Sequence, residues 1–143
     1  MSHFVLTRVI DAPLEKVWAA ADFTKSAGPY PMKVQNAGDP NKNGVGFTRA
    51  VTSGKRTIIE KLLEVDPMRS YTYTLAEGAP VREDYRGKVA FSSKGSATLL
   101  TWSADFTAKA PGTGWICVLA IKYTVNRILN SIEAECRTTA MSS

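Results

Sequence analysis

The sequence has little of the chemistry that metal centres and nucleophilic hydrolases need. Its 143 residues include one histidine, His3, and two cysteines, Cys117 and Cys136. Structural zinc sites take four Cys or His ligands, and Ser-His-Asp or Cys-His catalysis needs a histidine beside the nucleophile. We therefore expect no metal site and no catalytic triad. The cysteines fall in one predicted helix, which separates them by about 28 Å and excludes a disulfide between them.

A long uninterrupted apolar run is also missing. The best candidate for a membrane span, residues 115–132, contains Lys122, Asn126, Arg127 and Asn130. A spanning helix needs about 20 predominantly apolar residues. The first eleven residues lack the cationic, apolar and small-residue segments of a secretory signal. We expect no stable membrane insertion and a cytoplasmic location.

Basic residues exceed acidic ones, but they do not cluster in the sequence. Eighteen Lys and Arg against thirteen Asp and Glu give a net charge of +5, and Lys55-Arg56 is the only adjacent basic pair. Because a nucleic-acid site needs cations gathered on one face, we expect no nucleic-acid partner. Gly44 and Gly46 precede a predicted strand rather than a helix, so they do not form a phosphate-binding loop, and we expect no cofactor.

The order of periodic segments predicts one α+β domain that covers residues 1–143. This length buries a sufficient core without a metal or disulfides. We expect a strand at 4–10 and a short helix that begins at Pro13. Turn residues then separate six further predicted strands, at 32–37, 45–53, 56–66, 69–76, 83–92 and 97–108. An amphipathic helix at 115–137 ends the chain, and its apolar face can cover the sheet.

Three short motifs accompany this order of elements. They are Gly-Val-Gly-Phe-Thr-Arg at 44–49, Glu60 followed by Glu-Val-Asp-Pro at 64–67, and Leu-Thr-Trp at 100–102. Together they resemble the START-like (SRPBCC) superfamily, in its polyketide cyclase/dehydrase-like branch. The resemblance implies a helix-grip fold, in which a curved seven-stranded antiparallel sheet is wrapped around a long C-terminal helix and encloses a cavity for a hydrophobic ligand. It does not imply one function, because this fold serves carriers, cyclases, receptors and chaperone activators.

Alternation along three strands predicts which side chains face inward. The inward sets are Tyr71, Tyr73 and Leu75; Tyr85, Val89 and Phe91; and Leu100, Trp102, Ala104 and Phe106. From these strands and the last helix we select as ligand-binding candidates Tyr71, Tyr73, Tyr85, Trp102, Phe106, Ile121 and Val125. Two interpretations are open, since these aromatic residues either line a cavity or fill an ordinary core.

A predicted hairpin gives the most specific hypothesis. Gly at the first central position of a two-residue turn is typical of type II′, which places Gly54-Lys55 in the turn. Counting back from this turn sets Arg49 opposite Glu60, with apolar pairs on both sides. An inward pair would hold a polar group of a ligand, whereas an outward pair would be a weak surface ion pair. A turn shifted by one residue would abolish the pairing.

Three functions fit these residues. In the first, the protein binds a lipid, steroid or polyketide-like molecule, and Arg49 and Glu60 orient its polar end. In the second, it is a cyclase or dehydratase in which Arg49 polarises a carbonyl and Glu60 transfers a proton. An arginine partner weakens a carboxylate as a base, however.

In the third, it binds a protein partner through an outer surface, for which the sequence shows no exposed apolar patch. We expect Trp18 and Trp115 to pack their helices. The loops at 24–31 and 39–44 are the natural candidates for an entrance, and the protein is a monomer or a homodimer.

Overall fold

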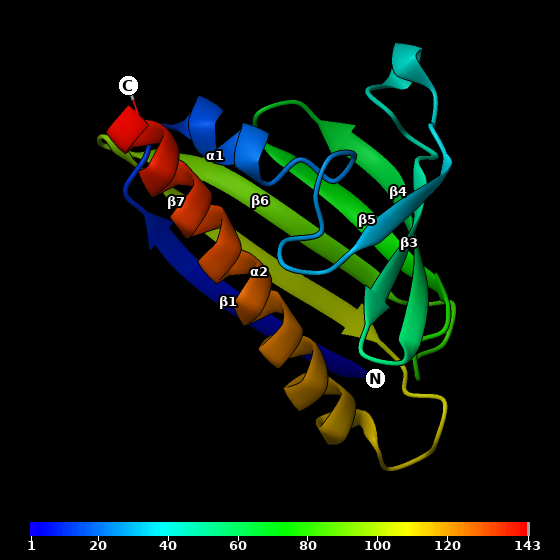
Figure 1. Cartoon of the computed structure of the whole chain (residues 1–143). Coiled ribbons are helices and arrows are strands. Elements are labelled where there is room, and N and C mark those ends of the chain that lie inside the picture. The colour runs from blue at the N-terminus through cyan, green and yellow to red at the C-terminus, as the bar shows by residue number, and fades with distance from the viewer. Residues whose placement is uncertain (143) are drawn as a thin grey trace.

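The computed structural model describes residues 1–142 and the side chains of residues 1–137 (Figure 1). The elements are β1 (Ser2–Ile10), α1 (Leu14–Ala20), β2 (Met32–Asn36), η1 (Pro40–Lys42), β3 (Thr48–Ser53), β4 (Arg56–Asp66), β5 (Ser70–Glu77), β6 (Arg86–Lys94), β7 (Ala97–Phe106) and α2 (Gly114–Ser142). The strands form one antiparallel sheet in the order β1-β7-β6-β5-β4-β3-β2. This sheet curves around α2, so the predicted α+β helix-grip fold is confirmed (Figure 1).

Two strands begin three residues later than the sequence indicates. The strand predicted at 83–92 is β6, which begins at Arg86, because the Tyr85 N–H donates to the Arg82 carbonyl and closes a turn (3.2 Å). The strand predicted at 45–53 is β3, which begins at Thr48, because Gly44 and Gly46 have φ values of +87° and +93°. Such positive φ values belong to turns rather than to extended strands.

The hairpin between β3 and β4 has the predicted register. Gly54 has φ +61°, and Ser53 lies opposite Arg56. Arg49 lies opposite Glu60 four pairs further along, and Val51 lies opposite Ile58. The pair is therefore fixed by the turn, since a shift of one residue would reverse every side chain of the hairpin.

The predicted inward sets are also confirmed by burial. Tyr71, Tyr73 and Leu75 are buried, as are the corresponding side chains of β6 and β7. The inner face of α2 packs on them through Val125, Leu129 and Ile132. At its C-terminal half α2 is tied to the edge strand β1, where the Arg8 guanidinium donates to Asn126, Asn130 and Glu133 at 3.2, 2.6 and 2.9 Å.

The N-terminal half of α2 differs from the expectation. Trp115 was expected to pack this end of the helix, but its side chain is 66% exposed. Position 115 is rotated around the helix by about 120° from Ile121 and about 80° from Val125, so Trp115 does not share the face that packs on the sheet. Among the described residues, no helix combines the length and apolar character needed to cross a membrane.

Candidate functional site

A cavity of about 440 Å³ lies between the inner face of the sheet and α2. Strands β3, β4 and β5 form one wall, the N-terminal half of α2 forms the opposite wall, and Phe23 and Tyr30 contribute from the segment after α1. The lining includes eight of the nine residues selected from the sequence, namely Arg49, Glu60, Tyr71, Tyr73, Tyr85, Trp102, Ile121 and Val125. The chain therefore brings these residues together around one space.

Phe106 is the ninth residue, and it does not line the cavity. Its side chain is fully buried, with its ring centroid 5.6 Å from that of Tyr85. Alternation places Phe106 on the correct face of β7, but the Tyr85 ring lies against it and belongs to the cavity lining itself. We therefore correct its assignment from ligand contact to core packing.

The Arg49 side chain is held on three sides. Its Nε donates to Glu60 Oε1 at 2.9 Å, and Nη2 lies 2.7 Å from the same oxygen. Its Nη1 donates to the carbonyls of Phe23 and Ser26 at 2.7 and 2.8 Å, and the guanidinium carbon lies 3.7 Å from the centre of the Phe23 ring. Only Nη2 has an N–H left for a ligand. Arg49 therefore fixes the local backbone, and its predicted role of polarising a carbonyl has little geometric room.

Glu60 has one carboxylate oxygen free to face the cavity. Its side chain is 15% exposed, and Oε1 takes both contacts with Arg49. Oε2 accepts no hydrogen bond from the side chains that the structure describes. No fully buried polar atom of these side chains lacks a partner, so Oε2 is not fully buried. Oε2 is thus a free acceptor at the cavity, placed beside apolar walls.

The segment after α1, expected as one side of an entrance, is fixed against α2. Arg49 holds its carbonyls, a Cβ at Gly28 would touch the Ile128 backbone at 3.0 Å, and the Arg127 guanidinium lies 5.3 Å from the Tyr30 ring. These contacts hold the segment in place on this side of the cavity. The opposite side is lined by Ser53, Arg56, Pro80 and Ile116, and Ile116 is half exposed.

A chain of hydrogen bonds crosses the sheet wall of the cavity. Trp102 Nε1 donates to the Tyr73 hydroxyl at 3.0 Å, and the Tyr73 and Tyr85 hydroxyls lie 3.2 Å apart. The two phenols carry two O–H hydrogens but share one hydrogen bond. One O–H group is therefore left without an acceptor among the described residues, whichever phenol donates to the other. It is a donor available to a ligand in the cavity.

Burial keeps these phenols protonated. Loss of hydration raises the pKa of Tyr71, Tyr73 and Tyr85 well above the ordinary value of 10.0, and the Glu60 charge adds to the rise for all three. Arg49 lowers the pKa of Tyr71 without reversing the shift. These residues are thus hydrogen-bond donors at neutral pH rather than bases.

The raised pKa values predict a loss of stability at alkaline pH. In the unfolded chain the phenols ionise near pH 10, whereas the buried phenols of the folded protein keep their protons. The unfolded state then binds fewer protons, so the free energy of unfolding is undiminished below pH 10 and falls as the pH rises above it. Urea midpoints at pH 8 and pH 11 measure this fall. Absorbance at 295 nm should show fewer phenolates in the folded protein at pH 11 than in the denatured chain, and equal numbers would contradict the prediction.

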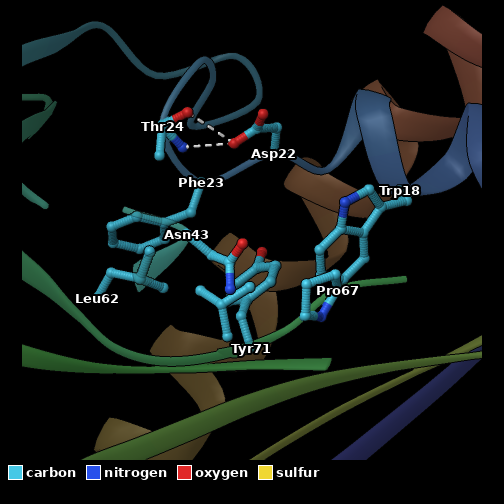
Figure 2. A pocket seen from close by; sticks show the side chains of 9 residues that line it. Trp18, Asp22, Phe23, Thr24, Asn43, Leu62, Pro67 and Tyr71 are labelled. Atoms are coloured by element: carbon cyan, nitrogen blue, oxygen red, sulfur yellow. Dashed lines mark hydrogen bonds between the residues drawn. The ribbon is translucent and has the colours of Figure 1, made fainter. Parts of the chain in front are cut away.

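Figure 2 shows a second, smaller hollow of about 230 Å³. Tyr71 and Phe23 line this hollow and the larger cavity as well. Trp18 packs on Tyr71 with ring centroids 6.3 Å apart, and Asp22 accepts hydrogen bonds from the N–H and hydroxyl of Thr24 (Figure 2). Tyr71 also donates to the Ala21 carbonyl at 3.2 Å. The Tyr71 and Phe23 rings thus separate the two hollows.

A comparison with protein families shows which family the chain belongs to. The family model described as polyketide cyclase/dehydrase and lipid transport matches residues 1–135. The chain belongs to this family. The resemblance found in the short motifs and in the order of elements is thereby confirmed. No curated protein matches the chain.

Solved structures of this fold cover nearly the whole chain at low identity. XoxI from Bacillus cereus has a TM-score of 0.76 at 20% identity, with 95% of this chain and 96% of that chain covered. The structure of Ara h 8.0201 has a TM-score of 0.74 at 18% identity, covering 95% and 97%. Norcoclaurine synthase from Thalictrum flavum, in complex with dopamine and hydroxybenzaldehyde, has a TM-score of 0.72 at 14% identity, covering 93% and 84%. At these identities the structures establish the fold of this family member.

Phe23 and Gly87 shape the site and were not selected by the sequence analysis. Phe23 gives Arg49 both a carbonyl and a ring face, but it lies in an irregular segment with no periodic signal. Gly87 occupies an inward position of β6 between Tyr85 and Val89, and a Cβ there would lie 2.5 Å from Cζ of Tyr73. A glycine at an inward position of a strand indicates that another group packs closely against the backbone there, so the sequence carried a signal for this contact. Among the described residues, no group of three His, Cys, Asp or Glu side chains is placed to hold a metal.

Proposed function

We propose that this family member binds a small, uncharged hydrophobic molecule in the cavity between the sheet and α2. The supporting observation is the cavity itself, since 440 Å³ lies within the range of small-molecule sites, about 300–1,000 Å³. Its lining is mostly apolar and aromatic, with a few convergent polar groups. A structure of the same fold holds dopamine and hydroxybenzaldehyde, so the fold accommodates small organic molecules.

The polar groups favour a carbonyl or hydroxyl group on the ligand over a carboxylate. The Tyr73–Tyr85 pair offers one O–H donor, and Glu60 Oε2 offers one acceptor. Arg49 is already neutralised by Glu60 and held by two backbone carbonyls. A ligand carboxylate would therefore meet the Glu60 charge without a free cation in the interior of the cavity. A neutral steroid or polyketide ketone fits these groups better than a fatty-acid anion.

Native mass spectrometry followed by solvent extraction tests whether the purified protein retains such a molecule. In parallel, tryptophan fluorescence measures the affinity for two probes, progesterone and palmitate. Val51→Phe fills the cavity from β3 and should weaken progesterone binding at least tenfold. Val9→Phe, the same change at an exposed position of β1, should leave the affinity unchanged within about twofold.

Three results would overturn the proposal. The first is an apo mass combined with no binding of either probe. The second is a Val51→Phe variant that unfolds at the wild-type temperature and still binds progesterone as the wild type does. The third is palmitate binding tighter than progesterone, which would overturn the preference for a neutral ligand while leaving the cavity as the site.

The free Oε2 of Glu60 supports catalysis as a second candidate function. A carboxylate within reach of a bound ketone can exchange a proton with the adjacent carbon. The ion pair with Arg49 already occupies Oε1, so only Oε2 is left to exchange that proton, which restricts the geometry open to this candidate. The compound extracted from the protein is therefore returned to wild type and to Glu60→Gln. Conversion by the wild type alone supports an enzyme, whereas unchanged recovery from both supports a binding protein.

A further inference from the structure

The N-terminal half of α2 presents an exposed apolar surface, which we call the α2 stripe. Its members are Trp115, Ile116, Leu119 and Tyr123, with exposed fractions of 66, 48, 60 and 65%. Residues three and four apart share a helix face, so these four side chains form a continuous strip on one side of the helix. Contiguous exposed apolar surface of this kind marks an interaction site, and the sequence analysis did not anticipate it.

The α2 stripe borders the open side of the cavity. Ile116 belongs to the stripe and also lines the cavity. The next residue, Cys117, has its Sγ 3.7 Å from the Pro80 carbonyl, and Pro80 lines the same opening from the loop after β5. In Figure 1 the start of α2 and the β3–β4 turn lie toward the same end of the molecule. A surface that covers the stripe would therefore also meet the opening.

Cations lie beside this opening, and none of the ion pairs among the described residues includes them. A shallow depression next to it is lined by Lys55, Arg56 and Lys109 and by no acidic side chain, and it shares Ser53, Arg56, Ala79 and Pro80 with the cavity. The Lys109 backbone N–H donates to the Pro80 carbonyl at 3.1 Å, which places residue 109 beside Pro80. Glu77 and Glu83 line a neighbouring depression, which shares Lys109 with the first and also contains Arg82.

We propose that this end of the molecule docks reversibly on the surface of a bilayer that contains anionic phospholipid. Aromatic and aliphatic side chains on an exposed helix face enter the boundary between headgroups and acyl chains, and nearby Lys and Arg bind the anionic headgroups. Docking in this orientation turns the cavity opening toward the lipid. The inference that the bilayer supplies or accepts the ligand rests on the proposed function, whereas the docking itself does not.

Charge favours a bilayer over a second copy of the chain. A twofold dimer brings the same surface of both subunits together, so a dimer through the α2 stripe would place the rim cations of each copy near those of the other. An anionic bilayer neutralises them instead.

Co-flotation with lipid vesicles tests the docking. Wild type should bind vesicles of phosphatidylcholine with about one-third phosphatidylserine, with at least tenfold weaker binding to pure phosphatidylcholine, and high salt should release it. Trp115→Ser/Leu119→Ser should reduce binding to the anionic vesicles at least tenfold. Lys55→Gln/Lys109→Gln should reduce it at least fivefold.

Each double variant has a matched control. Val5→Ser/Val9→Ser changes two exposed apolar residues of β1, and Lys88→Gln/Lys94→Gln removes two exposed cations of β6. Both controls should bind the vesicles as the wild type does. The stripe variant should still bind progesterone in solution without vesicles, which separates a failure of docking from a failure of the proposed function.

The proposal is overturned if wild type ignores anionic vesicles, or if the stripe and rim variants bind as well as their controls. It is also overturned if light scattering shows a wild-type dimer that Trp115→Ser/Leu119→Ser converts to a monomer. That result would assign the α2 stripe to a second copy of the chain.

Discussion

Arg49→Met should lower the free energy of unfolding by about 3–5 kcal/mol, because it leaves a partly buried Glu60 charge without its partner. The same change removes the donors to the Phe23 and Ser26 carbonyls, which then lose their hydrogen bonds inside the protein. Methionine preserves much of the side-chain volume, so the loss reflects the guanidinium rather than a cavity. Urea denaturation of the wild type and the variant measures this difference.

Two further variants separate the causes. Arg49→Lys keeps the positive charge but cannot contact Glu60 and two carbonyls at once, so its loss should be intermediate. Lys61→Met removes an exposed cation from the opposite face of β4 and should change stability by less than about 0.5 kcal/mol. If Arg49→Met costs less than about 1 kcal/mol, the pair is hydrated in solution and Arg49 is not needed to fix the segment after α1.

Because Arg49 supports the structure around it, loss of ligand binding by an Arg49 variant has an indirect explanation. A variant of Arg49 that no longer binds ligand has lost the support of Phe23 and of the Glu60 carboxylate, so it does not identify a direct ligand contact. Glu60→Gln keeps the size of the side chain and leaves Arg49 bound to its two carbonyls. It is therefore the cleaner test of chemistry in the cavity.

Local geometry explains which parts of the site could be predicted from the sequence. The Gly54 turn fixes a two-residue hairpin, and counting from it gives the Arg49–Glu60 pair directly. Alternation gives the inward aromatic residues, because the side-chain period of a strand does not depend on tertiary contacts. The order of elements then gives the fold, since only the last helix is long and apolar enough to cover the sheet.

The remaining features depend on packing between distant segments. Alternation along β7 predicts that Phe106 points to the inner face of the sheet. It does not predict that the Tyr85 ring packs against Phe106. The two carbonyls that hold Arg49 lie 26 and 23 residues away from it in the sequence and carry no side-chain signal. Trp115 is apolar, and its 66% exposure shows that no described segment covers its side of α2. Each of these three features depends on the position of a segment that is distant in the sequence, so the local sequence pattern does not predict it.

Gly87→Ala should have the second-largest effect, on stability and on ligand binding together. A Cβ at residue 87 would lie 2.5 Å from Cζ of Tyr73 and 2.8 Å from its hydroxyl oxygen, which is closer than atoms pack in proteins. Tyr73 is buried between Phe23, Tyr85 and Trp102, so its ring cannot move aside freely. Overpacking of this kind, together with weakened hydrogen bonds, should cost about 2–4 kcal/mol.

The displaced ring also loses its alignment with Trp102 and Tyr85, because the Tyr73 hydroxyl takes part in both hydrogen bonds. We therefore expect at least tenfold weaker progesterone binding by Gly87→Ala at a temperature where the variant is folded. Tyr73→Phe is the matched control, since it keeps the ring in place and removes the hydroxyl. It should lose only the affinity due to that hydroxyl, about two- to tenfold for a neutral hydrogen bond. Equal loss in both variants would show that the hydroxyl, rather than the position of the ring, determines binding, whereas no loss in either would remove the Tyr73–Tyr85 pair from the ligand site.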